Sequence, residues 1–215
     1  MLSFGDLGGG QAELPFWDYF EYDTFAPAGV PTCLGELATQ VGTTADDTLT
    51  GTSGPDIIFG WDGNDIIRGL GGDDRICAGT GADDVRGGPG SDVLQGARGS
   101  DRLVGNAGND TFDGGRGSDT VSFASSATAV NASLSNGAAS GQGDDTLVGV
   151  EDVVGSAFAD RLTGDEGANR LFGKGGRDIL DGAGGIDFLD GSAGLDFMPE
   201  RRDASQLLRA PREHD

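Results

Sequence analysis

Large apolar residues recur at every ninth position over a long stretch of the chain. When residues 42–122 are written in nines, position 6 of every unit is aspartate and position 8 is large and apolar. Glycine is frequent at positions 1, 2 and 4, which predicts a tight turn over positions 1–6. Positions 7–9 predict a short strand whose middle residue points inward. These inward residues are Leu49, Ile58, Ile67, Ile76, Val85, Leu94, Leu103, Phe112 and Val121.

The nine-residue pattern stops after the first block and then returns. Residues 123–154 break the period, although apolar and polar residues alternate around 130–134 and predict a strand there. Five further units occupy 155–199. We therefore divide the chain into an N-terminal capping segment (1–41), a nine-unit block (42–122), an irregular solenoid joint (123–154), a five-unit block (155–199) and a charged tail (200–215).

A three-residue strand cannot bury a core alone, so the units have to stack. Stacking at about 4.8 Å provides both the hydrogen bonds between strands and a continuous apolar interior. If two units form one turn, residues eighteen apart lie directly above one another. The predicted fold is all-β, a right-handed parallel β-roll of about seven turns with an N-terminal cap.

The high glycine content fits neither collagen nor a disordered chain. The chain has 41 Gly, against roughly 15 at an average usage of about 7%. Collagen requires glycine at every third position and much proline, whereas only 7 Pro are present. Disorder is disfavoured because 36% of the residues are hydrophobic. A regular repeat of tight turns remains.

The charge of the chain indicates a cation as its partner. The formal net charge is −22, which disfavours nucleic acid and anionic membranes as partners. Two units per turn would align the position-6 aspartates in two columns, where carboxylates about 5 Å apart repel strongly. A divalent cation between them reverses that sign. Ca²⁺ accepts six to eight oxygen ligands in flexible geometry and suits such a site better than Mg²⁺.

These units resemble the nonapeptides of the RTX (hemolysin-type) family, which form a calcium-loaded parallel β-roll. The closest is 87–95, Gly-Gly-Pro-Gly-Ser-Asp-Val-Leu-Gln. The resemblance implies a secreted or cell-surface bacterial protein that binds up to about ten Ca²⁺, each between two position-6 carboxylates and backbone carbonyls. The ligands it implies are Asp47, Asp56, Asp65, Asp74, Asp83, Asp92, Asp101, Asp110, Asp119, Asp160, Asp178, Asp187 and Asp196.

Some units depart from the family pattern, and we expect weaker sites there. Asn169 replaces aspartate at position 6, and Phe158 replaces glycine at position 4. Trp61 and Leu70 stand at position 2, where glycine is usual.

The two cysteines, Cys33 and Cys77, are too few for a zinc site beside a single histidine. A disulfide between them would hold the N-terminal segment against the first turns, and we favour it because the resemblance implies an extracellular setting. Two free thiols are the alternative.

The ends of the chain differ from the repeats. The aromatic segment 16–25 either caps the open end of the roll or docks a protein or cell-surface partner. In the tail, a short helix is expected around 204–209. Residues 1–41 show no signal-peptide pattern, and no apolar run reaches the length of a membrane span.

The sequence predicts a binding protein and no enzyme. The motifs His-Glu-x-x-His and Gly-x-Ser-x-Gly are absent from the sequence. We expect a secreted protein whose folding is driven by Ca²⁺. The alternatives are an adhesive or surface-layer spacer and an accessory module of a secreted hydrolase or toxin.

Overall fold

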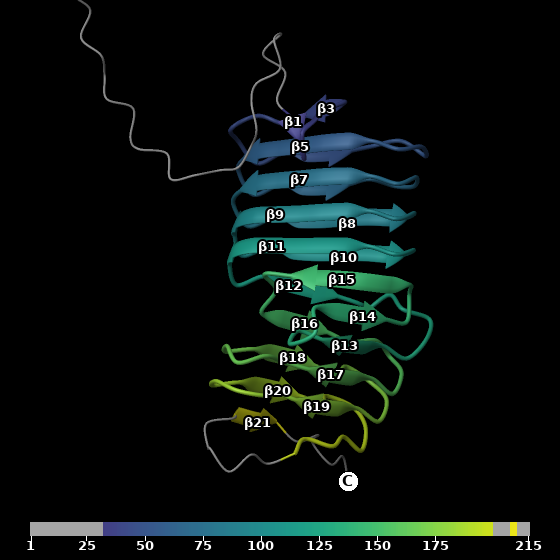
Figure 1. Ribbon diagram of the computed structural model, residues 1–215, viewed down its shortest axis with the longest axis vertical. Helices are drawn as coiled ribbons and strands as arrows, with labels where there is room; N and C mark the ends of the chain where they lie inside the picture. Colours follow the sequence, from purple (N-terminus) through teal and green to yellow (C-terminus); the bar gives the residue numbers. More distant parts are fainter. Residues whose placement is uncertain (1–31, 200–206, 210–215) are drawn as a thin grey trace, which may run out of the picture.

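The computed structural model describes residues 32–199 and 207–209. This part of the chain is built from strands, turns and bends, with no helix. The strands stack in about eight turns and form a parallel β-roll (Figure 1). The predicted fold class is thus confirmed, and the joint supplies strands beyond those of the fourteen repeat units.

Two sheets face each other across the roll. The ten-stranded sheet contains, in spatial order, β3 (Gln40–Val41), β5 (Ile57–Asp62), β7 (Arg75–Thr80), β9 (Val93–Gly99), β11 (Thr111–Gly117), β15 (Asp144–Val148), β14 (Ala138–Ser140), β13 (Asn131–Ser133), β17 (Arg161–Thr163) and β19 (Ile179–Asp181). The nine-stranded sheet contains β4 (Thr48–Thr50), β6 (Ile66–Arg68), β8 (Asp84–Pro89), β10 (Arg102–Ala107), β12 (Thr120–Ser122), β16 (Asp152–Val154), β18 (Arg170–Phe172), β20 (Phe188–Asp190) and β21 (Leu207–Arg209).

Strand pairing within each block follows the predicted register of eighteen residues. Leu103 pairs with Val85 in one sheet, and Leu94 pairs with Ile76 in the other. Two nonapeptides therefore complete one turn, and each strand lies directly above its counterpart in the next turn.

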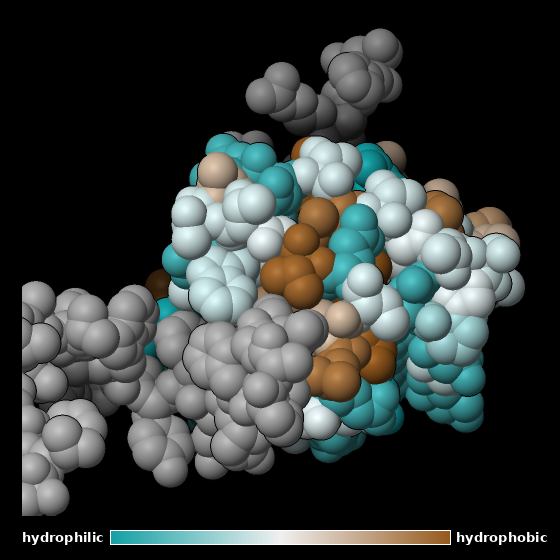
Figure 2. All heavy atoms as spheres, turned by 90° about the horizontal axis from the view of Figure 1, so that it is seen from above, coloured by the Kyte–Doolittle hydropathy of each residue, from teal (hydrophilic) through white to brown (hydrophobic). Residues whose placement is uncertain are grey.

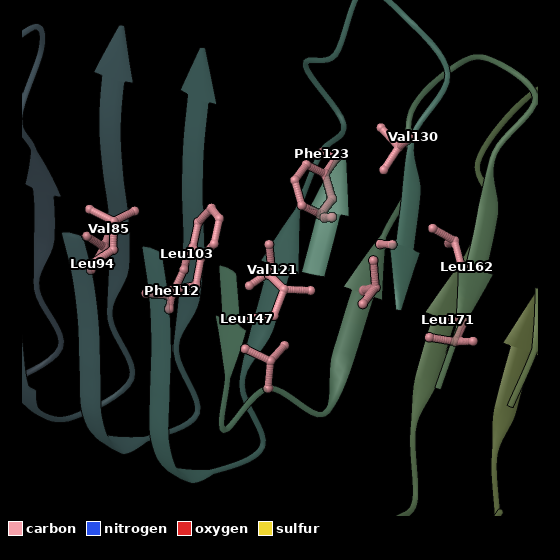
Figure 3. Close-up of a cluster of buried hydrophobic side chains, with 14 of the residues drawn as sticks. Val85, Leu94, Leu103, Phe112, Val121, Phe123, Val130, Leu147, Leu162 and Leu171 are labelled. Atoms are coloured by element: carbon pink, nitrogen blue, oxygen red, sulfur yellow. The ribbon is translucent and has the colours of Figure 1, made fainter. Parts of the chain in front are cut away.

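The position-8 side chains form the interior of the roll. From Ile58 to Val121 they are at most 1% exposed, and their counterparts from Leu162 to Leu189 are fully buried. They alternate from the two sheets and make one continuous core (Figure 3). At about 1.5–3 kcal/mol for each large buried side chain, this column is the main apolar stabilisation of the fold.

The joint inserts a hairpin into the ten-stranded sheet. β13 and β14 pair antiparallel, β14 pairs antiparallel with β15, and β13 pairs parallel with β17. The nine-stranded sheet passes the joint without interruption, because Val121 pairs with Val153. The core also continues, through Phe123, Val130 and Leu147.

A disulfide joins Cys33 to Cys77, as predicted, with an S–S distance of 2.12 Å. It anchors the hairpin of β1 (Thr32–Cys33) and β2 (Glu36–Leu37) on the outer face of the ten-stranded sheet, where both cysteines pack beside Phe59. An exposed ion pair between Arg75 and Glu36 lies beside it.

The ends of the roll differ in part from the prediction. The helix expected around 204–209 is contradicted at residues 207–209, which form β21 and pair in parallel with β20; residues 204–206 lie outside the described residues. β20 otherwise ends its sheet with open hydrogen-bonding groups, which favours the addition of a strand over a helix. At the opposite end of the roll, the view from above shows apolar residues at the centre of the end surface (Figure 2). The aromatic segment 16–25 lies outside the described residues.

Removing the disulfide should destabilise the roll. The closed loop spans 44 residues, and its loss should lower the free energy of unfolding by about 4 kcal/mol. The measurement is urea unfolding in calcium of the Cys33→Ala/Cys77→Ala protein. Glu36→Gln is the control in the same hairpin, and the loss of its exposed ion pair should cost less than about 1 kcal/mol. Equal stability of the double mutant and the wild type would contradict this prediction.

Candidate metal centre

The position-6 aspartates form two columns along the edges of the roll. From Asp47 to Asp101, the backbone N–H of each position-6 aspartate donates to Oδ1 of the aspartate one turn further on, at 2.7–3.0 Å. One edge carries Asp47, Asp65, Asp83, Asp101 and Asp119, and the other carries Asp56, Asp74, Asp92 and Asp110. The second block repeats the arrangement from Asp160 to Asp178 to Asp196 and from Asn169 to Asp187.

The second carboxylate oxygen of most of these aspartates is buried and unpartnered. Within the described residues Oδ2 forms no hydrogen bond in Asp65, Asp74, Asp83, Asp92, Asp101, Asp119, Asp178 and Asp196. Asp74 and Asp119 are completely inaccessible to solvent as whole residues. A buried charged oxygen without a partner is costly, so each of these atoms is placed to receive a cation.

Backbone carbonyls converge on the same points. Asp101 Oδ2 and the carbonyl oxygen of Gly114, one turn on, both lie closer to Gly96 than a Cβ on that residue would allow. A side chain at Gly96 would therefore fill the space between the two turns. The same arrangement repeats at Gly69, with Asp74 Oδ2 and the carbonyl of Gly87. Glycine at position 1 thus leaves room for a cradle of oxygens from adjacent turns.

Residues other than glycine at position 2 do not disturb this backbone. Trp61 and Leu70 adopt φ values of 84° and 82°, the left-handed conformation that Gly79 and Gly88 also have in the same place. The side chains carry a conformational cost of about 1–2 kcal/mol, but the strands there remain paired in register. Position 2 therefore gives no geometric reason for weaker sites at these units.

The columns raise the pKa of their carboxyl groups. Burial, followed by repulsion from column neighbours, raises the pKa of Asp92 and Asp101 to about 7, against the lowering effect of their backbone hydrogen bonds. Burial likewise raises the pKa of Asp83, Asp110 and Asp178 to about 6. Burial and repulsion thus make the ionised carboxylates unfavourable in the metal-free roll, and a divalent cation would stabilise them.

Two column members in the joint escaped the sequence prediction. Asp145 accepts the N–H of Asp110 at 3.0 Å, and Glu151 accepts the N–H of Asp119 at 2.8 Å. Only three residues separate β15 from β16 on the edge of Glu151. The turn is too short to present an aspartate at the usual height, and the extra methylene of glutamate reaches the column. The residues Asp144-Asp145-Thr146-Leu147 resemble the second half of a repeat unit and could have indicated Asp145, whereas no repeat pattern marks Glu151.

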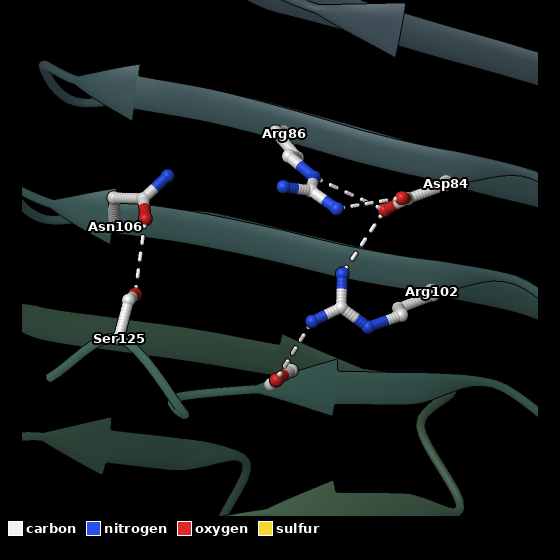
Figure 4. Close-up of polar contacts among 6 residues, drawn as sticks. Asp84, Arg86, Arg102, Asn106 and Ser125 are labelled. Atoms are coloured by element: carbon white, nitrogen blue, oxygen red, sulfur yellow. Dashed lines mark hydrogen bonds and ion pairs between the residues drawn. The ribbon is translucent and has the colours of Figure 1, made fainter. Parts of the chain in front are cut away.

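Acidic residues beside the columns have other partners. Asp84 lies on the outer face of the nine-stranded sheet, bonded to Arg86 and Arg102 at 2.8 and 3.0 Å (Figure 4). Burial raises its pKa, but both guanidinium groups outweigh that effect and hold the pKa below its usual range. Asp73 is exposed and accepts the N–H of Ser91 through Oδ1. Neither residue belongs to a column.

The oxygen set fits Ca²⁺. In the described part of the chain no three His, Cys, Asp or Glu side chains gather into a metal cage. Each site therefore combines a few carboxylate oxygens with neutral carbonyls. Hard oxygen donors in a flexible backbone suit Ca²⁺, and Mg²⁺ requires a tighter octahedron. When bound, Ca²⁺ would supply the positive charge that the paired carboxylates lack.

Comparison with known families agrees with this geometry. A family model that describes four copies of the RTX calcium-binding nonapeptide repeat matches the chain. The matched residues are 41–76, 62–85, 86–121, 140–180, 154–189 and 172–198. The chain belongs to the RTX calcium-binding nonapeptide repeat family. It is thus a calcium-binding repeat protein. No curated protein matches this RTX chain. The described residues of the RTX protein contain no helix that could cross a membrane.

Neutralising one column carboxylate should weaken calcium binding. Asp101→Asn keeps the acceptor for its backbone partner but removes a charge from a buried, unpartnered oxygen. We expect at least about a tenfold higher calcium midpoint, or about 1.4 kcal/mol, measured by circular dichroism during a calcium titration. Asp73→Asn is the control outside the columns and should titrate like the wild type. Indistinguishable midpoints for both variants would exclude Asp101 as a ligand.

Calcium should leave the roll as the pH falls. The raised pKa values mean that the folded, metal-free form binds protons more tightly than the unfolded chain, so its stability rises as pH falls through about 7 to about 6. Protons and Ca²⁺ compete for the same oxygens. The number of bound ions, measured by equilibrium dialysis, should drop across this range. A constant number down to the ordinary aspartate pKa would contradict the prediction.

Proposed function

We propose that this protein is a secreted calcium-binding module whose folding is completed by Ca²⁺. The observation that carries the proposal is the row of buried, unpartnered Oδ2 atoms along both edges of the roll. The fold stacks these carboxylates away from water, and among the described residues none of them has an ion pair with Lys, Arg or His.

The energetics favour a switch between compartments. Without Ca²⁺ the stacked carboxylates repel one another, and a net charge of −22 adds to that repulsion. Ligands that bind only the folded state contribute their binding free energy to folding. In the low calcium of a cytoplasm the chain stays unfolded, and in millimolar calcium outside the cell it folds.

The disulfide supports export of the protein to an oxidising compartment. Cys33 and Cys77 are both fully buried and bonded to each other, and structural disulfides persist mainly in secreted proteins. The repeat family is typical of proteins secreted by bacteria. Catalysis has no part in the proposal, since metal ligation accounts for the paired carboxylates.

Circular dichroism in EGTA and then in rising Ca²⁺ tests the proposal. We expect a disordered spectrum in EGTA and a cooperative gain of β-structure with calcium, reversed by excess EGTA. Mg²⁺ at the same concentrations is the control and should leave the chain unfolded, because it fits the shared site poorly. A chain that is already rich in β-structure in EGTA would refute calcium-driven folding.

A further inference from the structure

Four turns of the roll are closed in a way that the others are not. They are the first turn on each edge of each block, with position 6 at Asp47, Asp56, Asp160 and Asn169. In each of them the backbone N–H of position 2 donates to the side-chain oxygen of position 6 within the same turn. Position 2 carries a hydroxyl or a carboxylate in all four, namely Thr43, Thr52, Ser156 and Asp165.

The position-2 side chain completes the closure. Thr52 Oγ1 accepts the N–H of Gly54 at 3.2 Å and donates to Asp56 Oδ2 at 3.0 Å. Ser156 Oγ likewise accepts the N–H of Phe158 at 3.0 Å and donates to Asp160 at 2.7 Å. The N–H and the hydroxyl therefore both donate to the carboxylate. Their hydrogens take the place beside the carboxylate oxygens that a cation would take in the other turns.

Stacked turns have lost this option. Their position-2 and position-4 residues adopt positive φ, as at Gly79 (116°) and Gly81 (141°), and the N–H of Gly81 bonds the carbonyl of Arg98 in the next turn. Oδ2 of Asp83 is consequently left without a donor. The position-4 residues of the four opening turns are not in the left-handed region, which is why Ala45 and Phe158 can replace glycine there.

Asn169 shows what such a turn requires. Its Oδ1 accepts the N–H of Asp165 at 2.8 Å, and its Nδ2 donates to the carbonyl of Glu151 at 3.0 Å. A carboxylate could not make the second bond, and an amide brings no charge for a cation. At position 6 of this unit, a neutral asparagine stands in place of the usual aspartate, and its side-chain oxygen and nitrogen are both hydrogen-bonded.

We infer that the opening turns of both blocks are closed by hydrogen bonds from their position-2 residues and bind no Ca²⁺ of their own. The calcium array then begins with Asp65 and Asp74 in the first block and with Asp178 in the second. Once the chain is folded, the opening turns satisfy their own carboxylate or amide groups without a metal, and the calcium-bound turns stack on them. This inference rests on the proposed calcium-driven folding and assigns its boundaries.

Matched substitutions on one edge test the assignment. Asp56→Asn and Asp74→Asn change the same position in adjacent turns of one column, and Asp160→Asn and Asp178→Asn do so in the second block. Bound calcium is counted by metal analysis after equilibrium dialysis, with circular dichroism in saturating Ca²⁺ as the check on folding. We expect the ion count to be unchanged at Asp56 and Asp160 and to fall by at least one ion at Asp74 and Asp178.

Two further variants keep the outcome decisive. Asn169→Asp should add no ion, and Thr52→Val should lower thermal stability in saturating calcium without changing the ion count. Loss of an ion from Asp56→Asn or Asp160→Asn, or gain of one in Asn169→Asp, would overturn the inference. Calcium-driven folding is measured separately, by circular dichroism of the wild type in EGTA and in Ca²⁺. Wrong ion counts in the variants would therefore leave calcium-driven folding untouched, and a wild type already folded in EGTA would leave the ion counts valid.

Discussion

The stacking of aspartates within the edge columns is the constraint on which the roll depends. The backbone N–H groups of Asp65, Asp83 and Asp101 are each satisfied by the carboxylate of the following turn, so that the carboxylates cannot move apart without breaking the turn geometry. The same bonds place negative charges above one another in a dry environment, where like charges interact strongly. Hydrogen bonding thus fixes the geometry that electrostatics opposes, and a cation is needed to make the two compatible.

Most of the fold could be predicted from the period alone. Position 8 at Leu94 or Leu103 is apolar because the interior has room for one side chain per strand, and the eighteen-residue register follows from two such strands per turn. The joint could not be predicted in this way. Its hairpin reverses the chain direction, and a pattern with period nine contains no information about an insertion whose strands pair antiparallel.

The candidate site was predictable only as far as it is periodic. The aspartates of the repeats were found because each lies six positions into its unit. Glu151 occupies the same column through a shorter turn and a longer side chain, which a search for aspartate at a fixed spacing misses. The departures at Trp61 and Leu70 also have a different meaning in three dimensions, because the backbone keeps its left-handed conformation. The sequence gives the residue type at each position, whereas the conformation of a turn depends on its φ angles and on whether another turn stacks on it.

The position of a turn in its block explains these differences better than its composition does. Ser192 stands at position 2 of the last unit and carries the same hydroxyl as Ser156, yet it has positive φ and bonds Asp190 in the preceding strand. A hydroxyl at position 2 therefore closes a turn only where no nonapeptide turn precedes it on that edge. Each block has to begin once, and the joint, by interrupting the stack, creates a second beginning. The two blocks are in this sense two rolls that share one core, each opened by turns that satisfy their own polar groups.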